Sequence, residues 1–167
     1  MVTIFCTPKN FDGIFEVIQK NALRSWRKIS PDIEIIVFGN SYGAAEIAKE
    51  INGIYFPDVK CSKSGVPLLS DLFFNANKIC SFETLMFINS DIILPQNILG
   101  VINNIRNNFS RSLSVGFRWD MDVTHKIDFK NCKWCKDCKG HWDMDSMRDL
   151  LVSLTFDNLM SRPGPHG

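Results

Sequence analysis

Residues 33–38 read Ile-Glu-Ile-Ile-Val-Phe, a short and largely apolar run between Ser30-Pro31 and Gly39-Asn40. A run of this kind, without a helical repeat, is typical of a parallel strand that is buried on both faces. Proline and glycine on either side are residues that end regular structure. We therefore predict a buried strand over residues 33–38.

Helical and strand patterns alternate on both sides of this segment. Before it, residues 2–7 have the pattern of another buried strand, and the residues from Asp12 to Ile29 have that of an amphipathic helix. After it, residues 44–51 predict a short helix and residues 54–56 a third strand. The apolar face expected for the first helix consists of Phe15, Ile18, Ala22, Trp26 and Ile29. This β-α-β-α-β alternation implies an α/β fold with an open, mostly parallel, Rossmann-like sheet and helices on both faces.

The alternation continues to residue 119 and then stops. We predict a helix that opens at Gly65-Val66-Pro67, a strand over 84–88, a helix from Pro95 and a fifth strand over 113–119. The faces expected to be apolar are Leu69, Leu72, Phe73, Ala76 and Ile79 in the first of these helices, and Ile98, Val101, Ile102, Ile105 and Phe109 in the second. The sequence thus indicates an α/β domain over 1–123, a polar Cys/Lys-rich insertion over 124–142, and a C-terminal helix and tail over 143–167.

Composition limits the classes of partner. The 167 residues carry a formal net charge of +1, which provides no overall field for nucleic acid or an anionic membrane. No stretch approaches the roughly 18 apolar residues of a membrane span. Six unevenly placed cysteines do not resemble a disulfide scaffold and favour a reducing compartment. A soluble, cytoplasmic protein without a membrane span is expected.

The loops at the carboxyl ends of the strands are where an α/β sheet binds ligands. Asn89-Ser90-Asp91 directly follows the predicted fourth strand, and carboxylate and amide oxygens suit a hard divalent cation that bridges phosphates. Asp91 is the stronger ligand of the two. The competing interpretation, that Asp91 caps the next helix or shapes a turn, has about equal weight.

The segment Met86-Phe87-Ile88-Asn89-Ser90-Asp91-Ile92 and the order of elements over residues 2–123 resemble the nucleotide-diphospho-sugar transferases of the A-type glycosyltransferase fold. That family's metal motif, Asp-x-Asp or a variant, follows the fourth strand, and here Asn89 replaces the first Asp. The resemblance implies that Asp91 binds Mn²⁺ or Mg²⁺. It also implies that the donor is held by residues after several strands, namely Thr7, Pro8, Asn40, Ser64, Gly65 and Asn89. Asn40 stands where the family often has an acidic residue.

The resemblance also implies a longer chain, because such enzymes place the acceptor site after the fifth strand. About 45 residues follow Asp122, so a truncated member is expected. The implied reaction transfers a sugar from a nucleoside-diphosphate sugar to the hydroxyl of an acceptor whose identity the sequence does not reveal. Uncovered apolar surface would favour self-association. A nucleotidyltransferase is disfavoured because the loop after the first strand lacks a glycine-rich phosphate motif.

Two further groups have alternative interpretations. Arg118, Asp120 and Asp122 follow the predicted fifth strand and either contact the donor or form a surface ion pair. Cys132, Cys135, Cys138 and His141 have a spacing that can hold Zn²⁺, although a Lys-rich insertion with incidental thiols is slightly favoured. With a metal in that loop, the chain could instead be a catalytically silent binding module.

Overall fold

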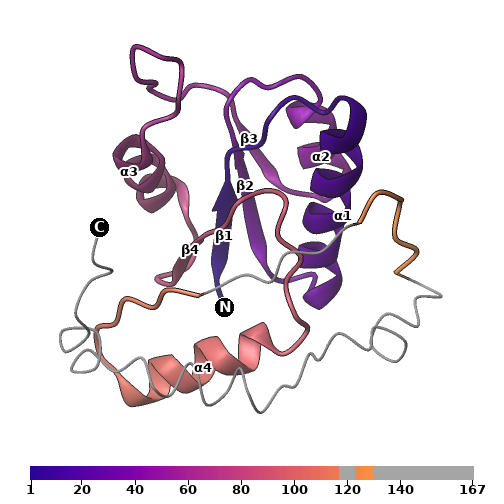
Figure 1. Ribbon diagram of the computed structural model, residues 1–167. Helices are drawn as coiled ribbons and strands as arrows, with labels where there is room; N and C mark the ends of the chain where they lie inside the picture. The colour runs from indigo at the N-terminus through magenta and orange to yellow at the C-terminus, as the bar shows by residue number, and fades with distance from the viewer. Residues whose placement is uncertain (117–122, 130–167) are drawn as a thin grey trace, which may run out of the picture. The chain divides into compact units, whose positions relative to one another are not determined.

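The computed structural model describes residues 1–116 and 123–129. The chain divides into two compact units, one of residues 1–98 and 121–130 and the other of residues 99–120 and 131–167. The first unit contains a parallel sheet with helices on both faces (Figure 1), which confirms the predicted open, Rossmann-like α/β fold.

The sheet has four strands in the order β3-β2-β1-β4, and every neighbouring pair is parallel. The strands are β1 (Thr3–Cys6), β2 (Glu34–Phe38), β3 (Ile54–Phe56) and β4 (Leu85–Phe87). Phe5 is in register with Ile36 of β2 and with Phe87 of β4. All four residues of β1 are buried, as expected for a strand with neighbours on both sides.

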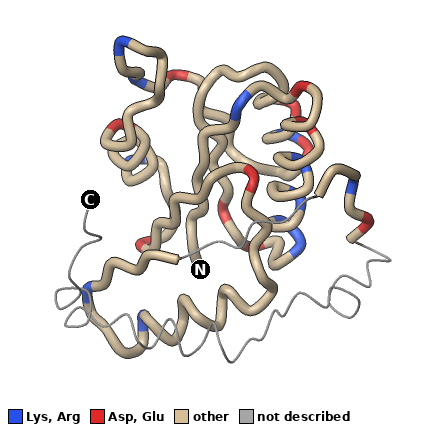
Figure 2. Tube along the Cα trace, viewed as in Figure 1, with Lys and Arg blue, Asp and Glu red and all other residues tan. Residues whose placement is uncertain are grey.

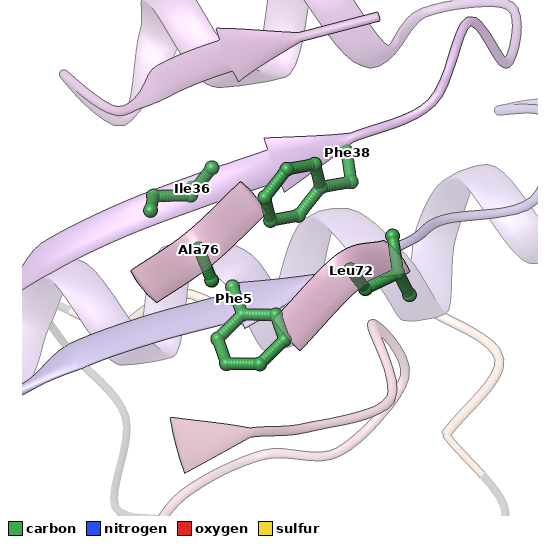
Figure 3. Close-up of a cluster of buried hydrophobic side chains, with 5 residues drawn as sticks. All are labelled: Phe5, Ile36, Phe38, Leu72 and Ala76. Atoms are coloured by element: carbon green, nitrogen blue, oxygen red, sulfur yellow. The ribbon is translucent and has the colours of Figure 1, made fainter. Parts of the chain in front are cut away.

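Helices cover the two faces of this sheet. Helices α1 (Gly13–Ile29) and α2 (Ala44–Glu50) lie on one side and α3 (Leu69–Ile79) on the other (Figure 1). Leu72 and Ala76 of α3 pack with alternate residues of the two central strands, namely Phe5, Ile36 and Phe38, in a fully buried cluster (Figure 3). Since side chains alternate along a strand, Ile4, Ile35 and Val37 face the opposite layer, and these residues are also buried.

The buried face of α1 is rotated from the predicted one. Phe15 is 37% exposed, whereas Gln19 and Leu23, outside the expected face, are buried together with Ala22 and Trp26. These four residues follow the i, i+3, i+4, i+7 spacing of one helix face. Buried polar side chains on α1 therefore caused the error.

Helix α3 begins at Leu69 and not at the predicted Gly65. The residues before it form a small turn, with an isolated antiparallel β-bridge between Cys61 and Pro67. Within this turn, Gly65 N donates to Ser62 O and Ser62 N donates to Val66 O. Because this turn uses the backbone groups of residues 61–67, they are not available to a helix. Leu69 and Phe73 of the expected face remain 54% and 44% exposed.

In the second unit, the structure describes α4 (Ile98–Asn108) and the residues that follow it as far as 116. The helix starts three residues after Pro95, and Ile102 of its predicted face is buried. The prediction of a fifth strand is wrong for residues 113–116, which are irregular, with Leu113 78% exposed. Within the described ranges no helix has the length and apolar content needed to cross a membrane.

Candidate functional site

The order in which the parallel strands are added to the sheet reverses next to β1. From β1 the chain proceeds to β2 and β3 on one side, and then returns to the other side of β1 as β4. In open α/β sheets, ligands bind outside the carboxyl ends of the strands at such a topological switch point, where the loops leave in opposite directions. The loops after β1 and β4 therefore form the candidate site.

The loop after β4 is a turn that alternates exposed and buried side chains. Ile92 N donates to Asn89 O at 3.1 Å, which closes a turn with Ser90 and Asp91 at its centre. Asn89 and Asp91 are exposed and Ser90 is 6% exposed. Among the described residues, neither the Asn89 amide nor the Asp91 carboxylate has a hydrogen-bond or ion-pair partner. Asp91 therefore does not cap α4, and its two oxygens are available to a ligand.

Gln19 of α1 connects the loops after β1 and β4. Its Oε1 accepts hydrogen bonds from Lys9 N at 2.8 Å and from Ser90 Oγ at 2.7 Å, and its Nε2 donates to Lys9 O at 3.1 Å. Gln19 is only 2% exposed. A buried amide that bonds to two loops holds them together, because breaking either contact leaves a polar group without a partner.

The loop after β1 is also bonded to the loop after β2. Ser41 Oγ donates to Pro8 O at 2.7 Å, Tyr42 N donates to Asn10 Oδ1 at 3.0 Å, and Phe11 N donates to Tyr42 O at 2.8 Å. The three loops that follow the adjacent strands β2, β1 and β4 thus form one hydrogen-bonded edge.

Gly43 lets the loops after β1 and β2 approach each other closely. It has φ +82, and a Cβ atom placed on it would lie 2.7 Å from Phe11 Cβ. A side chain at this position would therefore clash with Phe11 in a backbone conformation that already favours glycine.

Several residues predicted to bind the donor lie on this edge, namely Thr7, Pro8, Asn40 and Asn89, as does Asp91, the predicted metal ligand. Thr7 is half-buried, Pro8 is buried and Asn40 is exposed. Thr7 and Gly39, which precedes Asn40, lie close together, since a Cβ on Gly39 would be 3.5 Å from Thr7 Oγ1. These residues therefore lie in loops at the same edge of the sheet.

Ser64 and Gly65 are placed differently. They lie in the turn before α3, where Ser64 Oγ is 2.8 Å from Ser62 Oγ. Within the described residues no hydrogen bond joins this turn to the loops after β1, β2 or β4. Arg118, Asp120 and Asp122 lie outside the described residues, as do Cys132, Cys135, Cys138 and His141. Among the residues that the structure describes, Ser64 and Gly65 are therefore not part of the hydrogen-bonded edge formed by the three loops.

The turn after β4 offers a divalent cation the carboxylate of Asp91. No group of three or more His, Cys, Asp or Glu that could hold a metal occurs in the part of the chain that the structure describes. Asp91 with the Asn89 amide fits a different type of site, in which Mg²⁺ or Mn²⁺ takes one or two protein oxygens and completes its coordination with phosphate oxygens and water. The residues present therefore fit a metal that arrives with a phosphorylated ligand.

Two nearby groups contribute differently to the chemistry of the site. Cys6, directly before Thr7, is completely buried, and burial raises the pKa of its thiol far above the ordinary value. A thiol in this state is neither a nucleophile nor a metal ligand.

Lys9 is exposed and lies 4.4 Å from the centre of the Phe15 ring, and no described carboxylate pairs with it. Lys9 therefore supplies the edge with a cation that can meet phosphate.

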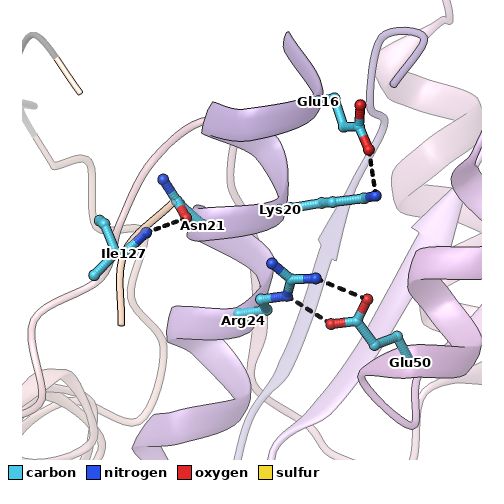
Figure 4. A network of polar contacts seen from close by, with 6 residues as sticks. All are labelled: Glu16, Lys20, Asn21, Arg24, Glu50 and Ile127. Atoms are coloured by element: carbon cyan, nitrogen blue, oxygen red, sulfur yellow. Dashed lines mark hydrogen bonds and ion pairs between the residues drawn. The ribbon is translucent and has the colours of Figure 1, made fainter. Parts of the chain in front are cut away.

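A hollow of about 730 Å³ lies elsewhere in this unit, along the C-terminal half of α1 and residues 126–129. Its charges are largely occupied. Arg24 pairs with Glu50 through two hydrogen bonds (Figure 4), and Arg27 donates to five backbone carbonyls, those of Ser30, Pro31, Ile33, Ile51 and Asn52. These contacts join α1, α2 and the start of β2, so they support the fold.

The surface of α1 and α2 carries both signs of charge (Figure 2), and Lys20 pairs with Glu16 on α1. This mixture agrees with the net charge of +1 and gives these helices no single-sign patch. The candidate site is therefore defined by individual side chains and not by an extended field.

Sequence reasoning missed Gln19, Ser90 and Lys9 as members of the site. The signal for Gln19 was present, because it precedes Ala22, Leu23 and Trp26 by three, four and seven residues and so shares their helix face. A polar residue within an apolar face needs a buried partner, which would have directed attention to the adjacent loops. Comparison with known proteins adds no further member, since no protein-family model, no curated protein and no solved structure matches the chain.

Proposed function

We propose that this chain binds a nucleoside-diphosphate sugar together with Mn²⁺ or Mg²⁺ at the carboxyl ends of β1 and β4, as the donor-binding domain of a glycosyltransferase. The observation that carries this proposal is the turn after β4, which presents Asn89 and Asp91 to solvent, without side-chain partners in the described part of the chain, while Ser90 anchors it. Oxygen ligands at a switch point favour a metal-bound phosphate ligand.

In this proposal, different residues of the edge contact different parts of the ligand. Asp91 and Asn89 offer oxygens for the cation, and the exposed Lys9 offers positive charge to the diphosphate. Thr7, Pro8 and Asn40, at the ends of β1 and β2, are the candidates for contact with the nucleoside. The hydrogen bonds between the three loops reduce the reorganisation that binding requires.

In the proposed reaction, the bond between the anomeric carbon and the diphosphate oxygen breaks, and a bond to the acceptor oxygen forms. The acceptor proton passes to a general base, a role that we assign to none of the described residues. A divalent cation held by Asp91 and Asn89 would supply positive charge to the leaving diphosphate. The chain's own part is to hold the donor. Lys9 would contact the negatively charged diphosphate, and Asp91 would contact the cation bound to it.

Calorimetric titration of the purified protein with UDP, and separately with GDP, tests this proposal. Each titration is run with Mn²⁺ and with EDTA, and uridine and guanosine monophosphates serve as controls. We expect affinity for a diphosphate that depends on Mn²⁺ and exceeds the affinity for its monophosphate, because the second phosphate completes the metal site. Equal binding with EDTA, or no binding of any nucleotide, would contradict the proposal.

A further inference from the structure

We propose that Gln19 is a positioning residue of this site, which fixes Asp91 by holding Ser90 against the loop after β1. This inference rests on the proposed function, since it assigns a role in metal-dependent binding to a residue that touches neither metal nor ligand. Its basis is the set of three hydrogen bonds that the Gln19 side chain makes to Lys9 and Ser90.

The geometry of these bonds fixes the orientation of the Gln19 amide. Nε2 donates to Lys9 O, so Oε1 is directed to the other two partners, Lys9 N and Ser90 Oγ. Both of these donors lie within 2.8 Å of one oxygen and are therefore within about 6 Å of each other. The backbone of the exposed cation Lys9 and the turn that carries Asp91 are thus tied to a single buried atom.

Gln19 controls the middle of the turn and not its ends. On the N-terminal side, Ile88 N donates to Phe5 O at 3.1 Å and extends the β1–β4 pairing. On the C-terminal side, Trp26 Nε1 donates to Ile92 O at 2.8 Å. Loss of Gln19 would leave both anchors in place, so the turn would stay near β1 while Asn89, Ser90 and Asp91 lose their fixed conformation.

Asn21 provides a matched control on the same helix. It is 1% exposed, and its amide also bonds to the backbone of a distant segment: Nδ2 donates to His125 O at 2.9 Å. Its Oδ1 accepts from Ile127 N at 3.0 Å (Figure 4). These bonds attach residues 125–127 to α1 and involve none of the loops after β1, β2 or β4. Asn21→Ala and Gln19→Ala therefore remove similar groups with different connections.

The test measures the affinity for UDP or GDP, with Mn²⁺ and with EDTA, in three proteins: the parent, Gln19→Ala and Asn21→Ala. We expect Gln19→Ala to lose about 10- to 100-fold in the Mn²⁺-dependent affinity, the range typical of residues that orient metal ligands. Asn21→Ala should lose stability and keep the metal-dependent affinity.

Amide hydrogen exchange on the ligand-free proteins gives a second measurement. Exchange at the Ile92 amide, which closes the turn by donating to Asn89 O, should accelerate in Gln19→Ala and not in Asn21→Ala. If the parent shows metal-dependent binding and Gln19→Ala binds as well as Asn21→Ala does, this inference alone is wrong. If exchange at the Ile92 amide is unchanged, Gln19 does not fix the turn, whatever the ligand. A parent without metal-dependent binding would refute the proposed function and the positioning role with it.

Discussion

Replacing Asp91 by Asn separates the charge of this residue from its size. Asp91 is exposed and has no protein partner among the described residues, so its attraction for a cation acts through a dielectric close to that of water. A single charge and a divalent cation about 4 Å apart then attract each other by about 2 kcal/mol. This corresponds to a loss of about 30-fold in affinity when the charge is removed.

The absence of metal reverses the expected effect. In EDTA the Asp91 carboxylate repels the diphosphate, so Asp91→Asn should bind a nucleoside diphosphate as well as the parent or slightly better. Asp32→Asn is the matched control, because Asp32 is also exposed but lies just before β2, at the opposite end of the sheet. Calorimetric titration with Mn²⁺ and with EDTA distinguishes these cases. If Asp91→Asn and Asp32→Asn have the same affinity in Mn²⁺, the reasoning about Asp91 is refuted.

Two further predictions concern the frame of the site. Partial burial acts to raise the pKa of Glu34, but hydrogen bonds from Ser81 and from β1 outweigh it and hold this pKa below its ordinary value of 4.5. The stability that the carboxylate contributes is complete above pH 4.5 and declines as the pH falls through the lowered pKa. The difference in free energy of unfolding between the parent and Glu34→Gln, measured by urea unfolding, should therefore shrink in acid. A difference that grows in acid would contradict this. Gly43→Ala should lower the free energy of unfolding by about 2 kcal/mol more than Gly65→Ala does. Both glycines have positive φ, but only Gly43 is crowded, by Phe11. If thermal unfolding shows the same loss of stability in both variants, the clash with Phe11 relaxes.

The strands were predictable because their signal is local. Residues 33–38 are apolar almost throughout, and a strand buried on both faces requires no other pattern. The position of Asp91 followed from the same signal, since a residue directly after a strand lies at the carboxyl edge. The sequence did not reveal that Ser90 is buried while its two neighbours are exposed, because the turn from Asn89 to Ile92 decides which way each side chain points.

The errors arose where distant partners override local pattern. Gln19 and Asn21 are polar yet buried, since each finds hydrogen-bond partners in segments far along the chain. Apolar periodicity alone cannot register such residues, and the predicted face of α1 was rotated as a result. Leu113 and Val115 alternate with small residues as strand residues do, but both are more than half exposed. An alternating pattern does not specify whether a strand has an edge to pair with.

The strand order also has a consequence during synthesis of the protein. β1 pairs with β2 on one side and with β4 on the other, and β4 is made roughly 50 residues after β2, which takes several seconds at typical translation rates. Until then β1, whose four residues are all buried in the folded protein, has one unpaired edge, to which a neighbouring nascent chain can add. β1 leads into the loop of Lys9, which Gln19 connects to Ser90 in the folded protein. Nascent chains are therefore most prone to aggregation before residue 87 leaves the ribosome, and slower growth or chaperones that act in that interval should raise the yield of folded protein.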